Sequence, residues 1–285
     1  MFICRFVDLL IHELDKVKRF GQNGHVVKIR EESSRPGLFE RLAPIVLVIC
    51  IGLAFVVGVL WQKVANLEKG GVAKTAADTQ ANPTISLDAV KGLFSKDLIK
   101  FGDEKRKVLF VEVSDPSCPY CHIAGGKNKA LIKGFDKDGT YVAPVPEMKK
   151  LVDEGKASYV LIYSPGHGAG EMGMKALYCA YEQGKFWEVN DLIMADAGYA
   201  LLNDVVKNDK AQSQKIVDFL KGVLDDAKLK ECLGSGKYDA RLTSDTALAT
   251  ELGISGTPFF TVNATSFPGA YSYKEMKPVV DKALK

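Results

Sequence analysis

The sequence lacks the features that mark several large classes of protein. Its 285 residues hold 38 lysines and arginines against 35 aspartates and glutamates, and the formal net charge is only +3. Because the two signs are mixed along the chain, there is no basic stretch of the kind that binds nucleic acid. No internal repeat is visible, and aromatic residues make up an ordinary 9% of the chain. We therefore predict neither a nucleic-acid partner nor a repeat architecture.

Cysteine is scarce, and only two of the six cysteines stand close together in the sequence. These two form the C-x-x-C motif Cys118-Pro-Tyr-Cys121. A zinc ribbon requires a second pair with matching spacing, which the chain lacks, so we predict no metal site. Two interpretations of the motif remain. It is a redox-active pair or, together with His122, the C-x-x-C-H motif to which c-type haem is attached.

The segment before this motif predicts a strand that ends just before the cysteines. Residues 108–113 are β-branched or apolar except for Glu112, which is typical of a buried strand, and residues 114–116 interrupt it. A helix that begins at the motif places Cys118 at its N-terminus, where the helix dipole favours a thiolate. Cys121 lies one turn further on, close enough to form a small disulfide with Cys118. This arrangement favours the redox interpretation.

A second motif stands near the C-terminus, where Thr257-Pro258 introduces an apolar strand. Together the two motifs resemble the DsbA-like thiol oxidoreductases of the thioredoxin superfamily, and the resemblance extends over residues 85–285. It implies an α/β, thioredoxin-like fold with a helical insertion at about residues 168–250, and residues 179–188 look like part of that insertion. Cytochromes have no counterpart of the Thr-Pro strand or of the insertion, which argues against haem.

The resemblance also implies roles for individual residues. Cys118 is expected to be the exposed nucleophile, and Cys121 the buried resolving thiol. Glu112 is expected to lie beneath them and relay protons to or from Cys121, although an ordinary strand position facing solvent is the alternative. The Thr257–Pro258 peptide bond is expected to be cis and to face the cysteines, with the backbone of Thr257 pairing with an extended substrate. The expected substrate contacts are Pro119, Tyr120, Thr257 and Pro258, and no cofactor is expected.

Several local features lead to further predictions. Gly125-Gly126 is unfavourable inside a helix and is expected to kink or shorten the helix that follows the cysteines. His122 is expected either to add positive charge near the thiols or to lie on the helix surface, and His167 is expected to be a surface or packing residue rather than a ligand. Strands are predicted at residues 158–163 and 259–263, with another near Ala270.

The N-terminal third contains a long, strongly apolar run without charged residues, 43–61. At about 1.5 Å per residue, this run just spans a hydrocarbon core of about 30 Å. A cleaved signal peptide is disfavoured because 42 residues precede the run and no small-x-small site directly follows it. We therefore expect a cytoplasmic tail at residues 1–42, a single transmembrane anchor at 43–62, a flexible linker at 63–83 and the folded domain at 84–285. The excess of basic residues before the anchor predicts a cytoplasmic N-terminus.

Cys179 and Cys232 lie outside the motif but within the part expected to be exported. Disulfides persist in extracytoplasmic compartments, so a separated pair of cysteines is most simply a structural disulfide. Two buried free thiols are the alternative.

These features lead to one main functional hypothesis and several alternatives. The main hypothesis is an oxidase, tethered to the cell membrane, that introduces disulfides into exported proteins through Cys118 and Cys121. Its expected partners are unfolded or reduced exported proteins and, as the resemblance implies, a quinone-linked membrane oxidase that restores the disulfide. The alternatives are a disulfide isomerase or reductase, a tethered binding or chaperone module, and a c-type haem protein.

Overall fold

The computed structural model describes residues 84–285. The predicted tail at residues 1–42, anchor at 43–62 and linker at 63–83 lie outside this part of the chain. Between residues 84 and 285, the structure contains no helix that is both long and apolar enough to cross a membrane.

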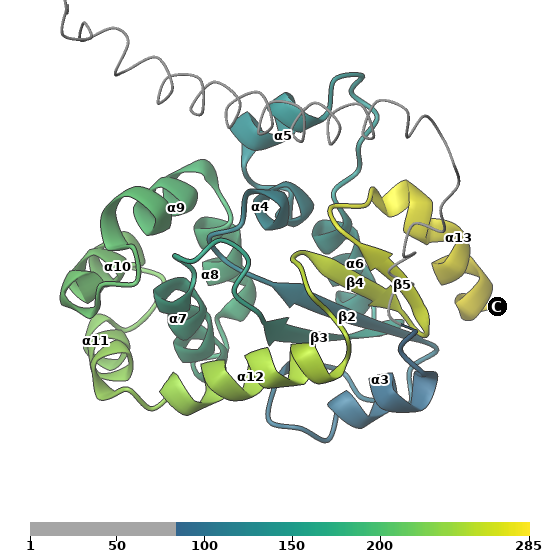
Figure 1. Cartoon of the computed structure of the whole chain (residues 1–285), viewed down its shortest axis with the longest axis horizontal. Coiled ribbons are helices and arrows are strands. Elements are labelled where there is room, and N and C mark those ends of the chain that lie inside the picture. Colours follow the sequence, from purple (N-terminus) through teal and green to yellow (C-terminus); the bar gives the residue numbers. More distant parts are fainter. Residues whose placement is uncertain (1–83) are drawn as a thin grey trace, which may run out of the picture. The chain divides into compact units, whose positions relative to one another are not determined.

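The described part is an α/β fold built on a mixed five-stranded sheet (Figure 1). The strands are β1 (Ile99–Phe101), β2 (Val108–Ser114), β3 (Ala157–Tyr163), β4 (Phe259–Val262) and β5 (Thr265–Pro268). The helices are α3 (Leu87–Leu93), α4 (Pro119–Gly125), α5 (Lys129–Phe135), α6 (Pro144–Asp153), α7 (Glu171–Glu182), α8 (Phe186–Ile193), α9 (Asp196–Ala200), α10 (Ser213–Phe219), α11 (Asp226–Ser235), α12 (Asp239–Glu251) and α13 (Tyr273–Leu284). A π-helical turn, η1 (Leu201–Val206), and a 3₁₀ turn, η2 (Lys210–Gln212), complete the elements.

The order of the strands across the sheet is β1-β3-β2-β4-β5. The two central strands, β2 and β3, are parallel and in register from Val108 opposite Ala157 to Ser114 opposite Tyr163. The remaining neighbours pair antiparallel. Every residue of β2 and β3 is buried, as expected for parallel strands covered on both faces. Strand order, strand directions and the helix that follows β2 make this a thioredoxin-like fold.

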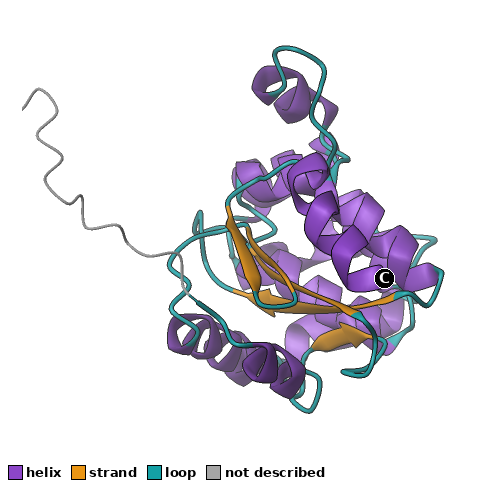
Figure 2. Ribbon diagram, turned by 90° about the vertical axis from the view of Figure 1, so that its right-hand side faces the viewer, coloured by secondary structure: helices purple, strands orange, loops and turns teal. Residues whose placement is uncertain are grey.

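Helices cover both faces of the sheet (Figure 2). Residues that alternate along β2 belong to two separate apolar clusters, because successive side chains of a strand point to opposite faces. Val108 and Phe110 share a cluster with residues of α6, α13 and the inserted helices, whereas Leu109 and Val111 share one with α3 and α12. The cysteine motif follows β2 directly, so the packing of this central strand fixes its position.

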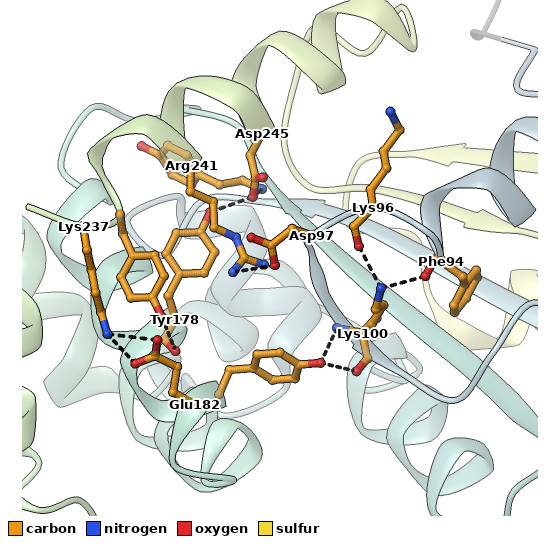
Figure 3. Close-up of polar contacts among 12 residues, drawn as sticks. Phe94, Lys96, Asp97, Lys100, Tyr178, Glu182, Lys237, Arg241 and Asp245 are labelled. Carbon is orange, nitrogen blue, oxygen red and sulfur yellow. Dashed lines mark hydrogen bonds and ion pairs between the residues drawn. The ribbon is translucent and has the colours of Figure 1, made fainter.

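The helices inserted between β3 and α12 are α7 to α11, which gather at one side of the sheet (Figure 1). Asp245 of α12 attaches them to the core, because its carboxylate accepts hydrogen bonds from the Tyr178 hydroxyl of α7 at 2.6 Å and from the Tyr163 N–H of β3 at 3.2 Å. The Arg241 guanidinium stacks on the Tyr178 ring at 4.4 Å from its centroid (Figure 3). The expected insertion is therefore present as α7–α11, while α12, which overlaps the end of the expected range, packs on the sheet itself.

Cys179 of α7 and Cys232 of α11 form a disulfide within the insertion, with 6.1 Å between their Cα atoms. The two residues are separated by 53 positions. Closing a loop of this length stabilises a fold by about 4 kcal/mol on the chain-entropy account. The alternative of two free thiols does not describe this structure.

Of two further expectations, the shortened helix is confirmed and the last strand differs in position. The helix after the cysteines was expected to be kinked or shortened, and α4 does end at Gly126, whose φ of 73° is left-handed and favours glycine. A second helix, α5, begins after Asn128, whose side chain accepts the Leu131 N–H. The strand expected near Ala270 is instead β5, which ends at Pro268 because the chain turns at Gly269 with a φ of 105°.

Candidate redox-active site

The cysteine motif forms the N-terminus of α4. Cys118 is the N-cap residue, with extended backbone, and Pro119 occupies the first turn, where a missing N–H breaks no helical hydrogen bond. The N–H groups of Tyr120 and Cys121 remain free to bind the Cys118 sulfur, and both lower the pKa of that thiol. Cys121 lies one turn further along α4 and receives the N–H of Asp115 on its sulfur at 3.5 Å.

The Thr257–Pro258 step lies beside Cys118 and its peptide bond is cis, as predicted. Val113 of β2 pairs with Phe259 of β4, so the residues that follow β2 and those that precede β4 meet at the same end of the sheet. The Cys118 Sγ is 3.5 Å from the carbonyl oxygen of Thr257. The sheet register thus brings together two motifs that are far apart in the sequence.

The expectation that Cys118 is exposed is wrong. Its exposed fraction is 4%, and Cys121 is completely buried. Both cysteines pack against Met194, which follows α8 in the inserted helices. The insertion therefore covers the sulfur pair, and a partner that reacts with Cys118 must approach from beside Met194 and the Thr257 carbonyl.

The pKa values of the two thiols are shifted in opposite directions. The pKa of Cys118 is lowered to about 6, mainly because the Cys121 thiol hydrogen-bonds to it, with Thr257 and the two backbone N–H groups adding to the effect and burial opposing it. Burial raises the pKa of Cys121 well above its ordinary value, and its hydrogen bond and charge interaction with Cys118 raise it further. At neutral pH the reduced pair therefore holds a Cys118 thiolate and a Cys121 thiol. A thiolate of this kind is the nucleophile in disulfide exchange.

Glu112 is buried within β2, which excludes the alternative of a solvent-facing strand position. Its carboxylate accepts a short hydrogen bond from the Tyr159 hydroxyl of the neighbouring strand β3. Burial raises the pKa of Glu112, and hydrogen bonds from Tyr159 and Ser114 offset part of this rise. Ser114 also lowers the pKa of Cys121, so it lies near both the carboxyl group and the resolving thiol. These contacts are those that a proton relay to Cys121 requires, and that role remains a prediction.

Asp115 organises the turn between β2 and α4. One carboxylate oxygen accepts the N–H and the hydroxyl of Ser117, each at 2.8 Å. The other oxygen accepts the N–H groups of Gly166 at 2.7 Å and His167 at 2.8 Å. The loop after β3 is thereby bound to the active-site turn. The side chain of His167 is exposed, as predicted, and only its backbone contributes.

His122 does not supply the charge that the sequence suggested, nor does it lie on the helix surface. Its ring is completely buried, with Nε2 2.8 Å from the carbonyl oxygen of Pro116 and Nδ1 2.9 Å from that of Met194. Burial lowers the pKa of His122 although its bonds to these two carbonyl groups oppose the change, and His122 is not among the groups that lower the pKa of Cys118. Both ring nitrogens are engaged by carbonyl groups, whereas a c-type haem would require one of them for iron. The ring instead joins the active-site turn to the inserted helices.

The surface beside the motif carries exposed aromatic rings. Tyr120 is 53% exposed and Phe135 of α5 is 42% exposed. Their ring centroids are 6.3 Å apart in an edge-to-face arrangement. Pro119 is partly exposed and Pro258 is buried, so of the four expected substrate contacts Tyr120 presents the most surface.

The sequence analysis missed three residues of the site: Asp115, Tyr159 and Met194. Asp115 stands in a Ser-Asp-Pro-Ser stretch that indicates a turn, but its bonds to the loop after β3 are long-range. Tyr159 and Met194 occupy an ordinary strand position and an ordinary helix end. No local spacing in the sequence relates either residue to the cysteines.

Comparison with known proteins gives a consistent picture of the fold. A family model described as thioredoxin matches residues 145–282, a range that begins after the cysteine motif and includes the Thr257–Pro258 step. A putative protein-disulfide oxidoreductase of Rickettsia conorii is 26% identical over 229 residues, which is 77% of this chain and 72% of that protein.

Two further comparisons cover unequal parts of the molecules. A Na⁺/H⁺ antiporter, NhaA 3 of Salinispora tropica, is 26% identical over 184 residues, and the match covers 64% of this chain. The chain spans only about a quarter of that antiporter, 24% of its length. The crystal structure of alpha-DsbA1 from Wolbachia pipientis has 21% identity and a TM-score of 0.48, covering 66% of this chain and 91% of that one.

The acidity of Cys118 can be tested by removing its main cause. In the reduced protein, the ultraviolet absorbance of the thiolate should titrate with a midpoint near pH 6. Cys121→Ala removes the strongest hydrogen bond to the sulfur, so the midpoint should move to higher pH. His122→Asn is the matched control, because His122 is not among the groups that lower the pKa of Cys118. A titration midpoint that is the same with and without the Cys121 thiol would contradict this account.

Proposed function

We propose that the protein catalyses thiol–disulfide exchange through Cys118 and Cys121. The observation that carries this proposal is the opposed acidity of two adjacent thiols, one with a pKa of about 6 and one with a pKa well above the usual range. The thioredoxin-like fold and the cis Thr257–Pro258 bond beside Cys118 support it. The name of the Rickettsia conorii relative, a putative protein-disulfide oxidoreductase, points to the same chemistry.

The reaction requires no group other than the two sulfurs and a partner cysteine. A partner thiolate attacks Cys118 of the oxidised pair, the Cys118–Cys121 bond breaks, and Cys121 takes up a proton. A second partner thiolate then attacks the partner sulfur of the mixed disulfide and Cys118 leaves as the thiolate. The partner has lost two electrons and gained a disulfide, and the pair has gained the two electrons.

The direction of net transfer that we propose is oxidation of the partner. A thiolate that is stable at neutral pH stabilises the reduced pair, and for a two-electron couple each pKa unit below the ambient pH makes the potential more oxidising by about 30 mV. The low pKa of Cys118 therefore supports an oxidase. An isomerase or a reductase is the alternative, because both use the same nucleophile.

The partner that we propose is an unfolded or reduced exported protein. Such a chain offers an extended backbone to Thr257 and Pro258, and side chains to Pro119 and Tyr120. Strand addition next to Thr257 would give affinity without sequence preference. The exposed rings of Tyr120 and Phe135 favour a partner whose apolar residues are not yet buried.

The location that we propose is the outer side of a cell membrane, with residues 43–62 as the anchor. The Cys179–Cys232 disulfide supports an oxidising compartment, since disulfides are rare in reducing ones. A membrane-bound, quinone-linked oxidase is the partner that would return the pair to its disulfide form. A tethered chaperone with unreactive cysteines is the alternative, and the low pKa of Cys118 disfavours it.

Oxidative refolding separates these functions. Reduced ribonuclease should regain activity in the presence of the oxidised protein, while Cys118→Ala should give no acceleration over buffer. Reduction of insulin by the reduced protein, measured in parallel, should be slow. Fast insulin reduction together with no gain of ribonuclease activity would replace the oxidase with a reductase, and failure of both assays would contradict thiol–disulfide exchange altogether.

The proposed topology has its own test. In cells from which any outer wall has been removed, added protease should digest the domain after residue 62 and spare the N-terminal tail. Epitope tags at the two ends of the chain would show separately whether the C-terminal domain is digested and whether the N-terminal tail survives. A protected C-terminal tag in intact cells, followed by digestion once the cells are opened, would contradict the proposed location.

A further inference from the structure

A tyrosine on β3 is the closest partner of the buried acid at the redox site. The parallel register of the two strands places Tyr159 opposite Phe110, two residues before the position of Glu112. From there the Tyr159 hydroxyl donates its hydrogen bond to Oε2 of Glu112. Both side chains are buried, with exposed fractions of 1% for Tyr159 and 3% for Glu112. The contact is therefore shielded from water.

The surroundings of this pair are largely apolar. The Tyr159 ring packs against Trp187 and Phe101, with centroid distances of 5.2 and 6.4 Å. On the other neighbouring strand, β4, the residue opposite Glu112 is Phe260. None of the ion pairs formed between residues 84 and 285 includes Glu112. The carboxylate therefore depends on neutral hydrogen-bond donors rather than on a cation.

The groups that face the pair come from three elements. Ser114 of β2 lowers the pKa of Glu112, and Cys121 of α4 lies close enough for its charge to raise the pKa of Tyr159. From α6, the Lys149 ammonium pairs with Asp153 and lies over the Trp187 ring, at 5.6 Å from its centroid, and it forms no ion pair with Glu112. The titratable groups at this position are thus Glu112, Tyr159 and Cys121.

We propose that Tyr159 is a positioning residue for proton transfer between Glu112 and Cys121. Its phenol fixes the orientation of the carboxyl group and stabilises the carboxylate form, which is the form that can accept a proton. This inference rests on the proposed thiol–disulfide exchange and on the relay role of Glu112. It adds a residue that no pattern in the sequence indicates.

The proton step can be written for the resolution of a mixed disulfide at Cys118. The Cys121 thiol transfers its proton to the Glu112 carboxylate, and the resulting thiolate attacks the Cys118 sulfur. The Cys118–Cys121 bond forms, the bond between Cys118 and the partner sulfur breaks, and the partner leaves as a thiolate. The pair is oxidised by two electrons, the partner is reduced by two, and Glu112 holds the proton. In the opposite direction Glu112 returns the proton to Cys121.

Removal of the phenol hydroxyl changes the pKa of Glu112 in a definite direction. The hydrogen bond from Tyr159 lowers the pKa of Glu112, so its loss raises that pKa further above the ordinary value. The fraction of Glu112 present as carboxylate at neutral pH then falls, and proton transfer from Cys121 slows. A hydrogen bond to a charged group is strong enough to change the ratio of carboxylate to carboxylic acid by about tenfold or more. The pKa of Tyr159 is itself raised well above 10, so the phenol remains a donor throughout.

The chain provides a matched control on the same strand. Tyr163 is also a buried tyrosine of β3, and its hydroxyl has no hydrogen-bond partner in the described residues. Tyr163→Phe therefore removes a hydroxyl from the same strand and the same kind of environment without removing a bond to Glu112. If the two substitutions affect the reaction differently, the difference is due to the hydrogen bond to Glu112 and not to the loss of an oxygen atom from a buried ring.

The experiment is a single turnover of the reduced protein with a symmetric, fluorogenic peptide disulfide. Attack by Cys118 releases the first peptide, and attack by Cys121 on the mixed disulfide releases the second. We expect the first phase to be unchanged in Tyr159→Phe. The second phase should slow about tenfold at neutral pH, with its pH midpoint moved upward. Tyr163→Phe should match the parent protein in both phases.

A double-mutant comparison distinguishes a role through Glu112 from a role in packing. Glu112→Gln should slow the second phase, and adding Tyr159→Phe to it should have no further effect. An unchanged second phase in Tyr159→Phe, or an equal slowing in the Glu112→Gln background, would overturn the inference. Absence of the first phase in the parent protein would instead overturn the proposed function. The two failures are therefore distinguishable.

A second variant keeps the test valid if Tyr159→Phe does not fold, which its melting curve would show. A ring-fluorinated tyrosine at position 159 keeps the size of the side chain and makes the phenol a stronger donor. The pH midpoint of the second phase should then move downward, opposite to the effect of phenylalanine. A midpoint that stays in place would overturn the inference.

Discussion

The hydrogen bond between the two active-site sulfurs is the interaction on which the rest of the site depends. It lowers the pKa of Cys118 more than any other contact, and the same bond raises the pKa of Cys121. The two effects cannot be separated, because one shared proton stabilises one thiolate and keeps the other sulfur a thiol. Neither sulfur needs a cation for this. His122 is not among the groups that lower the pKa of Cys118, and the asymmetry comes from position along α4 and from burial.

The surrounding fold holds that asymmetry in place. β2 ends at Ser114, and the turn fixed by Asp115 begins α4 at the sulfurs. The sheet register brings Thr257 to one side of Cys118, and the insertion brings Met194 to the other. The buried imidazole of His122 bonds to the turn and to the carbonyl of Met194, so it connects these two halves. In the neighbouring part of the core, the Tyr159 hydroxyl donates a hydrogen bond to the buried Glu112 carboxylate.

Much of this arrangement could be predicted from the sequence because its determinants are local. The run at residues 108–113, the C-x-x-C motif and the Gly125-Gly126 break each specify their own conformation, and the resemblance supplied the cis bond at Thr257. The predictions that failed concern the burial of two side chains and their long-range contacts. Cys118 was expected to be exposed, and His122 to carry charge or face solvent, because a helix N-terminus is normally at the surface. The inserted helices cover both residues, and a packing contact with Met194, many residues distant, leaves no trace in local spacing.

The central claim is that Cys118 is a thiolate and Cys121 a thiol at neutral pH. The most direct test is the reduction potential of the pair, measured by equilibration with glutathione over a range of pH. Below the pKa of Cys118, two protons accompany two electrons and the potential falls by about 59 mV per pH unit; above it, one proton is taken up and the slope halves to about 30 mV. We predict that the slope changes near pH 6. A steep slope that continues to the ordinary pKa of a free thiol, about 8.5, would contradict the claim.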